Sequence, residues 1–455
     1  MEKINRLFVP EHVIVIFALT ATFFTGAFLF SYNPFLPLFA GGSLLVLSLF
    51  FSSPLLLLAI LIVVRMSLDY SSQYVTLNIF ETTLTLSQLI GLGIAALGSI
   101  LIFQNKEKLL KYPFFYPLLL VFFWGASTLP YSIVPGSTLT ELIRIFGLLS
   151  IGFMAYLVTK KTQDYKILLI ALLVSSFLPV LFSLYQFLFG VGFSDSDVAL
   201  ARIFGTFSHP NILSLYLFSL LVVTVLFFLI PSLKESAQKK NISLVLFGIF
   251  SLLLLLTFTR VAWVVAFLFV ATLLFFRFRI ALIPIVILPI ILYFISPNFS
   301  DRVQESLSPD PDSSIVWRQN LWHDTTLKTV QDDRQILGYG MSSFPFVSEN
   351  LRGENKGSND PHNDLIRFFV EGGYIGLLVY LVYSATILFI LLRAAFTQKG
   401  WLKDSLLIMS LFWLCLLFAS LSDNIFKNTP VEWIFFILAG SLVALAQKNI
   451  PKKGK

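Results

Sequence analysis

Apolar runs of about 18 residues or more recur along the whole chain, and they limit its possible folds more than any other feature. A helix of that length crosses a hydrocarbon core of about 30 Å. Charged residues make up only 13% of the chain, against roughly 25% in an average soluble protein. A soluble core cannot absorb so much apolar surface. The sequence therefore predicts an all-α polytopic integral membrane protein, with one polytopic membrane domain over residues 1–455.

Polar breaks between the apolar runs predict about fourteen transmembrane helices. The second and third runs are short and contain Pro34, Pro37 and Pro54, so they could form one re-entrant pair, which leaves the expected number at about 12–14. The first run is long for a signal-peptide core and is predicted to be an uncleaved helix. The predicted helices span residues 13–30, 34–51, 53–68, 84–103, 113–130, 139–159, 167–189, 211–231, 242–258, 261–276, 280–296, 366–392, 405–422 and 430–447.

Basic residues follow alternate connections between these helices and predict the topology. Most of the 32 Lys and Arg residues fall on one side if the N-terminus is cytoplasmic. Because cytoplasmic loops carry the excess of basic residues, both termini are expected in the cytoplasm. The large loop, residues 297–365, is then extracytoplasmic. The basic residues on the cytoplasmic side are Lys3, Arg6, Lys106, Lys108, Lys111, Lys160, Lys161, Lys166, Lys234, Lys239, Lys240, Arg277, Arg279, Arg393, Lys399, Lys403, Lys448, Lys452, Lys453 and Lys455.

Composition also argues against several kinds of site and partner. Cys415 is the single cysteine, so the chain has no intramolecular disulfide and no cysteine metal cluster. The net charge of +7 is spread over short clusters between apolar runs, so no nucleic-acid partner is expected. Asp332 and Asp333 suggest a metal site, but two adjacent carboxylates on a polar loop are more often solvated. No metal and no cofactor are assigned, and the role of this pair stays open.

The large loop is polar, and a loop of its length among short connections is usually functional. It contains a predicted amphipathic helix around residues 314–330. Ile315, Trp322 and Val330 are available for the inner face of that helix.

Two arginines on the predicted outward side are functional candidates, because arginines near a membrane are costly. Arg260 ends one predicted helix and begins the next, where either lipid headgroups or a bound anion could receive it, and the anion is favoured. Arg202 lies in a loop that leads into a helix beginning at Pro210, with Ser208 or His209 at the cap position. Arg144 with Glu141, and Arg65 with Asp69, have the spacing of ion pairs within one helix.

His362 lies where the large loop returns to the membrane. A neutral imidazole there can accept a proton near neutral pH, which suits a general base. The alternative is that His362 and Asn363 form a helix cap. Arg367 can pair with Asp364 or with Glu371 at helical spacing and make this helix end rigid.

These segments together resemble the O-antigen ligase and O-antigen polymerase superfamily of bacterial envelope enzymes. Their order and topological setting match that superfamily as well as their residues do. The matching segments are residues 202–211, 257–260, 317–340 with its Gly338-Tyr339-Gly340 turn, and 361–373.

The resemblance implies metal-independent, inverting glycosyl transfer at the outer face of the bacterial cytoplasmic (inner) membrane. The donor would be a polyprenyl-diphosphate-linked glycan, and the acceptor a sugar hydroxyl on a glycan or a lipid-linked molecule. By position, Arg202 and Arg260 would bind the diphosphate, Arg318 would contact phosphate or sugar, and His362 would activate the acceptor. Guanidinium groups can stabilise the charge of a diphosphate leaving group without a metal. The supporting residues would be His209, Asn211, Asn363, Asp364, Arg367 and Glu371.

A polysaccharide-lipid flippase or other secondary transporter is the main alternative. Transporters place their charges near the bilayer midplane on broken helices, whereas the candidate residues here gather toward one face. An oligosaccharyltransferase-type enzyme usually has acidic metal ligands in its first outward loop, which here is only residues 31–33 and contains no acid. The sequence does not distinguish ligase from polymerase, and it does not identify the acceptor or the sugar.

Overall fold

The computed structural model describes residues 36–67, 69, 76–79, 82–193, 202–231, 237–277, 282–308, 313–352 and 359–449. The first predicted helix, residues 13–30, lies outside these ranges. The chain divides into two compact units, residues 1–61 and 62–455. In the first unit, α2 (Leu36–Ser52) is followed by α3 (Pro54–Ser67), which continues into the second. Pro54 begins α3, so the chain breaks at the proline that the sequence marked.

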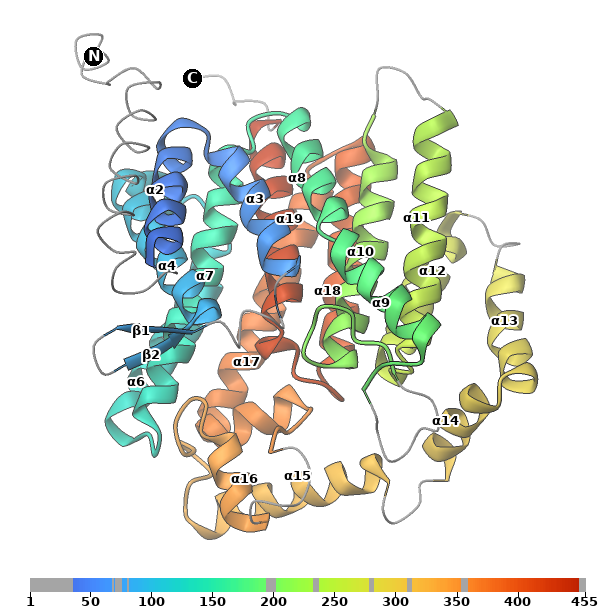
Figure 1. The fold of residues 1–455 in the computed structure, drawn as a ribbon. Helices are drawn as coiled ribbons and strands as arrows, with labels where there is room; N and C mark the ends of the chain where they lie inside the picture. The colour runs from blue at the N-terminus through green and yellow to red at the C-terminus, as the bar shows by residue number, and fades with distance from the viewer. Residues whose placement is uncertain are drawn as a thin grey trace, which may run out of the picture. The chain divides into compact units, whose positions relative to one another are not determined.

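The second unit is helical apart from one hairpin, in which β1 (Thr76–Ile79) pairs antiparallel with β2 (Thr82–Thr85) and Thr76 lies opposite Thr85. Figure 1 shows the ribbon. After the hairpin come α4 (Leu86–Gln104), α5 (Lys106–Leu109), α6 (Phe115–Thr128), η2 (Leu129–Tyr131), α7 (Pro135–Val158), α8 (Thr162–Val174), α9 (Phe177–Phe189), α10 (Pro210–Leu229), α11 (Ala237–Leu256), α12 (Arg260–Arg277), α13 (Leu282–Ile295), α14 (Pro297–Leu307), α15 (Ser314–Gln331), α16 (Phe344–Arg352), α17 (Asp364–Phe396), α18 (Gly400–Ala419), η4 (Ile425–Lys427) and α19 (Thr429–Lys448).

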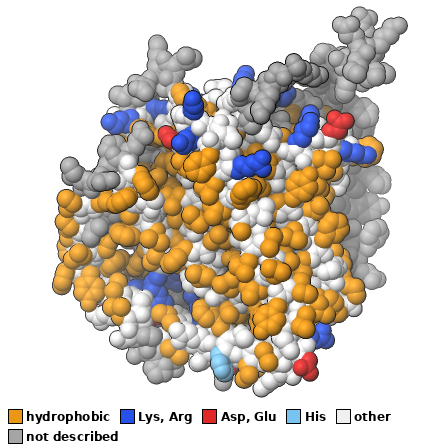
Figure 2. All heavy atoms as spheres, turned by 180° about the vertical axis from the view of Figure 1, so that it is seen from behind, with side chains coloured by type: hydrophobic (Ala, Val, Ile, Leu, Met, Phe, Trp, Pro, Cys, Tyr) orange, Lys and Arg blue, Asp and Glu red, His pale blue; other side chains and the backbone are white. Residues whose placement is uncertain are grey.

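The chain is an all-α polytopic membrane protein. Within the described residues, seven helices are long and apolar enough to cross a membrane, and five shorter helices are also apolar. Figure 2 shows a broad band of hydrophobic side chains on one face, with most of the visible Lys and Arg side chains above it. The long apolar runs of the sequence thus become membrane-length helices, as predicted.

One predicted helix, residues 167–189, is interrupted. The helical segment begins earlier, at Thr162, and α8 gives way to α9 at Ser175 and Ser176. The two serine hydroxyls donate to the carbonyls of Leu172 and Leu173 at 2.7 and 2.6 Å, and Pro179 follows within the next turn. Backbone-bonding serines and a proline are common causes of such kinks.

Helix α19 lies at the centre of the second unit. It packs against α7, α8, α10, α17 and α18, and nearly all of its side chains are buried. An apolar helix enclosed on all sides serves as the core around which the other helices assemble.

Contacts between connections define two ends of the bundle. At one end Lys448 Nζ donates to the Lys160 carbonyl at 3.0 Å, and Gln447 Nε2 donates to the Lys111 carbonyl at 3.0 Å. The connections that meet here contain Lys111, Lys160 and Lys448, which the sequence analysis assigned to the cytoplasmic side. At the other end the Ile133 amide donates to the Tyr339 carbonyl of the large loop at 3.1 Å.

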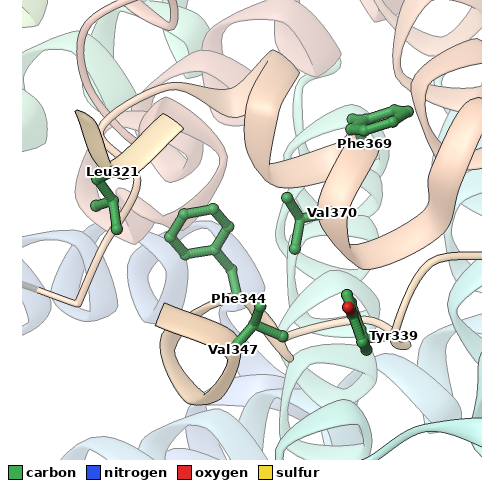
Figure 3. Packing of buried hydrophobic residues seen from close by; sticks show 6 residues of the cluster. All are labelled: Leu321, Tyr339, Phe344, Val347, Phe369 and Val370. Carbon is green, nitrogen blue, oxygen red and sulfur yellow. The ribbon is translucent and has the colours of Figure 1, made fainter. Parts of the chain in front are cut away.

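The large loop is folded against this second end, where α15 runs across the direction of the long helices rather than along it (Figure 1). The predicted helix is present, but its inner face was predicted only in part, since Ile315 and Trp322 are partly buried and Val330 is not. Leu321, Thr325 and Thr329 are the buried residues of α15, whereas Val330 is 46% exposed. Leu321 belongs to an apolar cluster with loop residues and the start of α17 (Figure 3), and that contact determines which face of α15 is buried.

Candidate functional site

Arg202 is buried against the turn that joins α11 to α12. Its Nε donates to the Thr257 carbonyl at 2.9 Å, and its Nη2 donates to Thr259 Oγ1 at 3.0 Å and to Asn211 Oδ1 at 3.1 Å. Thr257 lies just beyond the C-terminus of α11, where the negative end of the helix dipole favours a cation. One guanidinium therefore ties together the starts of α10 and α12 and the end of α11.

His209 is a helix cap, one of the two interpretations left open by the sequence. Its Nδ1 accepts a hydrogen bond from the Asn211 amide at 3.1 Å, and Pro210 occupies the first turn of α10. This cap holds the Asn211 side chain beside Arg202.

Arg260 begins α12 and contacts the large loop. Its Nη1 lies 3.2 Å from Glu305 Oε2, and its Nη2 donates to Ser314 Oγ at 3.1 Å. The side chain is 24% exposed, so it is more accessible than Arg202. Because Thr259 precedes Arg260 in the chain and accepts a hydrogen bond from Arg202, both arginines contact the short turn between α11 and α12.

Helix α15 connects Arg260 to the region of His362. An α-helix rises about 1.5 Å per residue, so the contacts of α15 with Arg260 and with Pro361 are about 12 Å apart along its axis. Arg318 lies between them on the same helix. Arg260, Arg318 and His362 are thus arranged along one short helix. The three contacts are Arg260 Nη2 to Ser314 Oγ at 3.1 Å, Arg318 Nη1 to the Ser422 carbonyl at 3.3 Å, and Trp322 Nε1 to the Pro361 carbonyl at 2.5 Å.

His362 faces a carboxylate that the sequence analysis did not single out. Its Nδ1 lies 3.4 Å from Oδ1 of Asp423, in the connection between α18 and α19, and its side chain is 16% exposed. A carboxylate accepts hydrogen bonds, so we infer that the imidazole carries its proton on Nδ1. That tautomer leaves Nε2 able to accept a proton.

Asp423 is held in its charged form. Burial opposes ionisation of its carboxyl, but the hydrogen bond from His362 and the electrostatic contacts with His362 and Arg318 outweigh burial, so the pKa of Asp423 lies below its usual range. Since Arg318 contacts the neighbouring Ser422, the base candidate and one arginine converge on the same turn.

Asn363, not His362, caps α17. Its side-chain oxygen accepts from the Leu365 and Ile366 amides at 3.0 and 3.2 Å. His362 lies outside the helix at φ +48°, a left-handed conformation that is uncommon for residues other than glycine. The cap alternative therefore belongs to Asn363, and the imidazole of His362 is available for other contacts.

Arg367 occupies the centre of a buried ionic network. Its Nη2 donates to Glu141 Oε1 at 2.8 Å and its Nε donates to Glu371 Oε1 at 3.2 Å, while Asp364 Oδ1 lies 3.8 Å from Nη1. Both predicted pairings of Arg367 are thus present. Glu141 also pairs with Arg144, as its spacing predicts.

The network extends beyond one helix, which the sequence analysis did not foresee. Arg144 on α7 also pairs with Glu432 on α19. Arg65 pairs with Asp69 at the end of α3, as its spacing predicts. Buried charges cost free energy, and breaking one partner of such a network is strongly destabilising. Glu141 and Glu432 are acidic residues within apolar helices, and this position was the sequence signal that could have indicated their part in the network.

The predicted glycine turn fastens the large loop to α17. Gly373 lies at φ +60° and kinks α17, and the Tyr339 and Gly340 amides donate to the Val370 and Glu371 carbonyls at 3.1 and 2.9 Å. A Cβ on Gly338 would lie 2.4 Å from the Glu371 carbonyl carbon, so only glycine fits there. The turn holds the loop against the helix that follows His362.

Among the described residues, no group of three or more His, Cys, Asp or Glu side chains is placed to hold a metal ion. Asp332 accepts hydrogen bonds from Lys328 at 2.7 Å and from Tyr339 at 2.7 Å, and these contacts lower the pKa of its carboxyl. It stabilises the end of α15.

Comparison with known proteins identifies one segment. Residues 244–381 match the family model described as O-antigen ligase. No curated protein matches the chain. The matched segment runs from α11 into α17 and includes Arg260, Arg318 and His362, whereas Arg202 and Asp423 lie outside it. The match confirms the resemblance to the O-antigen ligase and polymerase superfamily and supports glycosyl transfer of that general type.

Proposed function

We propose that the protein transfers a glycan from a polyprenyl-diphosphate carrier to an acceptor hydroxyl at the outer face of the bacterial cytoplasmic membrane, and the match of residues 244–381 to the O-antigen ligase family model supports this proposal. The observation that carries the proposal is the pair of His362 and Asp423. A histidine oriented by a carboxylate, beside an arginine and near the membrane end of a large loop, suits activation of a hydroxyl group.

The proposed step is one direct displacement. His362 Nε2 takes the proton of the acceptor hydroxyl while the hydroxyl oxygen attacks the anomeric carbon of the donor sugar. The bond from that carbon to the diphosphate oxygen breaks, and the diphosphate leaves with the electron pair. A single displacement inverts the anomeric configuration.

Arg202, Arg260 and Arg318 bind the diphosphate in this proposal. Planar guanidinium groups can contact phosphate oxygens with two hydrogen bonds and stabilise the charge that develops on the leaving group. Arg202 is fixed by the α11–α12 turn, Arg260 contacts the start of α15 at Ser314, and Arg318 lies on α15 itself. Asn211, His209, Asn363, Asp364, Arg367 and Glu371 hold these groups in place.

Glycan transfer by His362 variants tests the proposal. The full-length protein in lipid nanodiscs is supplied with a purified lipid-linked donor and a defined acceptor. We expect His362→Ala and His362→Gln to reduce turnover by roughly 10²–10⁴-fold with donor binding retained, because the base is lost and the arginines remain. His323→Ala is the matched control, since His323 is 74% exposed on α15.

Transfer by His362→Ala at the parental rate would remove His362 from the mechanism. Loss of donor binding instead would make His362 a phosphate ligand. A parental protein without transfer from any lipid-diphosphate donor would reject the proposed reaction.

A further inference from the structure

A cavity of about 300 Å³ lies beside the ionic network and is not part of the proposed donor site. Residues of α3, α4, α7 and α19 line it. Its polar lining includes Arg65, Gln88, Glu141 and Arg144, and Trp433 forms part of its apolar wall. An apolar cavity of this size with a few converging polar groups is typical of a small-ligand site.

The charges around this cavity favour a neutral ligand. Arg65 is paired with Asp69, and Arg144 is paired with both Glu141 and Glu432. These two guanidiniums therefore face three carboxylates, which leaves no surplus positive charge to attract an anion. Paired groups of this kind present both donors and acceptors, which sugar hydroxyls can use together.

The cavity is open on an apolar side. Leu92 of α4 and Ile143 of α7 both line it, and they are 42% and 37% exposed. In an all-α membrane protein, exposed aliphatic side chains on membrane-length helices face lipid tails. A ligand that entered here could keep an alkyl chain in the bilayer while its polar head lies among the arginines and Gln88.

Glu141 connects the cavity to the proposed catalytic residues. It lines the cavity and accepts a hydrogen bond from Arg367 at 2.8 Å. Arg367 lies in the first turn of α17, and His362 directly precedes the Asn363 cap of that helix. The Glu141 side chain thus separates the cavity from the first turn of α17, the helix that follows the proposed base.

We propose that this cavity binds the uncharged sugar head of a membrane-anchored acceptor, with its alkyl anchor passing between Leu92 and Ile143. The identity of this ligand as the acceptor rests on the proposed glycosyl transfer. The anchor-proximal sugar lies in the cavity, and the hydroxyl to be glycosylated extends toward His362.

Two glycines of α4 provide a cavity-filling variant and its control. Gly91 lines the cavity and Gly93 does not, and a Cβ on either would meet no atom within 4 Å. Gly91→Leu should therefore fill the cavity without a clash, while Gly93→Leu makes the same change on the same helix outside it. Gly147→Val, from the α7 wall, is a second filling variant should Gly91→Leu fold poorly.

Photolabelling tests binding without requiring transfer. The full-length protein in nanodiscs is irradiated with a dodecyl maltoside that carries a diazirine in its alkyl chain, and the labelled peptides are identified by mass spectrometry. Labels are expected on α4 and α7 of the parent and of Gly93→Leu, with at least a tenfold loss in Gly91→Leu. Excess unlabelled dodecyl maltoside should compete, and dodecyl phosphate should not.

Equal labelling of Gly91→Leu and Gly93→Leu would overturn the proposal, as would competition by dodecyl phosphate alone, which would indicate an anion site. In transfer assays Gly91→Leu should raise the KM for the acceptor about tenfold and leave the KM for the donor unchanged; a raised donor KM would contradict the acceptor assignment. Labelling should persist in His362→Ala, so failure of the proposed reaction and failure of the cavity proposal give different results.

Discussion

Backbone strain in the described residues is concentrated at the end of the bundle that carries the large loop. All four non-glycine residues with positive φ in this part of the chain lie there: Phe258, Asp333, Ser342 and His362. Phe258 is in the turn that Arg202 holds, and His362 is the proposed base. Each such residue costs on the order of 1–3 kcal/mol and persists only where its surroundings enforce it. Two of the four strained positions therefore lie at the proposed site: His362 itself, and Phe258 beside Arg202.

Replacing the carboxylate partner of His362 should separate orientation from binding. Asp423→Asn removes the charge that supports protonation of the imidazole, so we expect turnover to fall about 10–100-fold while the KM for the donor changes less than threefold. The kinetic parameters of Asp423→Asn and Asp423→Glu measure this difference. Rescue by glutamate is expected, and equal activity of the asparagine variant would contradict an orienting role.

The lowered pKa of Asp423 also defines a pH range. A carboxyl whose pKa is depressed on folding stabilises the folded state above its unfolded pKa of about 3.9 and loses that contribution as pH falls through the folded value. The Asp423 carboxylate should therefore stay ionised beside His362 at pH values above about 4.

The sequence identified the candidate site residues more successfully than the residues that they contact in the structure. Arg144 with Glu141, and Arg367 with Asp364 and Glu371, are close in sequence, so spacing predicted their contacts. Asp423 was missed because it is brought to His362 only by the packing of α17, α18 and α19. No local pattern indicates such a contact.

Among the secondary-structure elements, the glycine turn determines where the large loop lies. The predicted helix ends are mostly within a few residues of the observed ones, because polar breaks and prolines mark them. The buried face of α15 was predicted only in part, because a hydrophobic pattern does not reveal that Leu321 packs near Phe344 and Val370 (Figure 3).

A methyl group at Gly338 should displace the loop from α17. Its φ of +67° and the 2.4 Å approach to the Glu371 backbone leave no room for a Cβ, so Gly338→Ala should lower the free energy of unfolding by about 1–3 kcal/mol. The melting temperature and the protease sensitivity of the loop measure the effect. Gly248→Ala on α11, where a Cβ meets no atom within 4 Å, is the control and should behave like the parent. Unchanged loop protection in Gly338→Ala would contradict this anchoring role.

For the whole molecule, the two ends of the bundle agree with the distribution of basic residues. The connections near Lys111, Lys160 and Lys448 meet at one end, and the large loop folds at the other. This arrangement fits cytoplasmic termini and an outward loop, which remain predictions about orientation in the membrane.

Thiol labelling should determine that orientation. In a Cys415→Ala background, cysteines at Ser313 and at Ser236 should react oppositely with an impermeant reagent added to intact cells. Ser313 begins the α15 segment of the loop, so it should label from outside, and Ser236 should label only after permeabilisation. Equal labelling at both positions would reject the topology.

The ion pair between Arg260 and Glu305 has a consequence for selectivity. Before the donor binds, Arg260 already has a counter-ion supplied by the loop, so the proposed diphosphate must exchange with a tethered carboxylate rather than enter a vacant cationic site. A monovalent anion gains little from that exchange, whereas a multivalent one that reaches several arginines at once gains enough to displace Glu305. The loop carboxylate would then select against chloride and simple carboxylates at Arg260. Release of Glu305 from Arg260 would also couple donor binding to movement of α14, which carries Glu305.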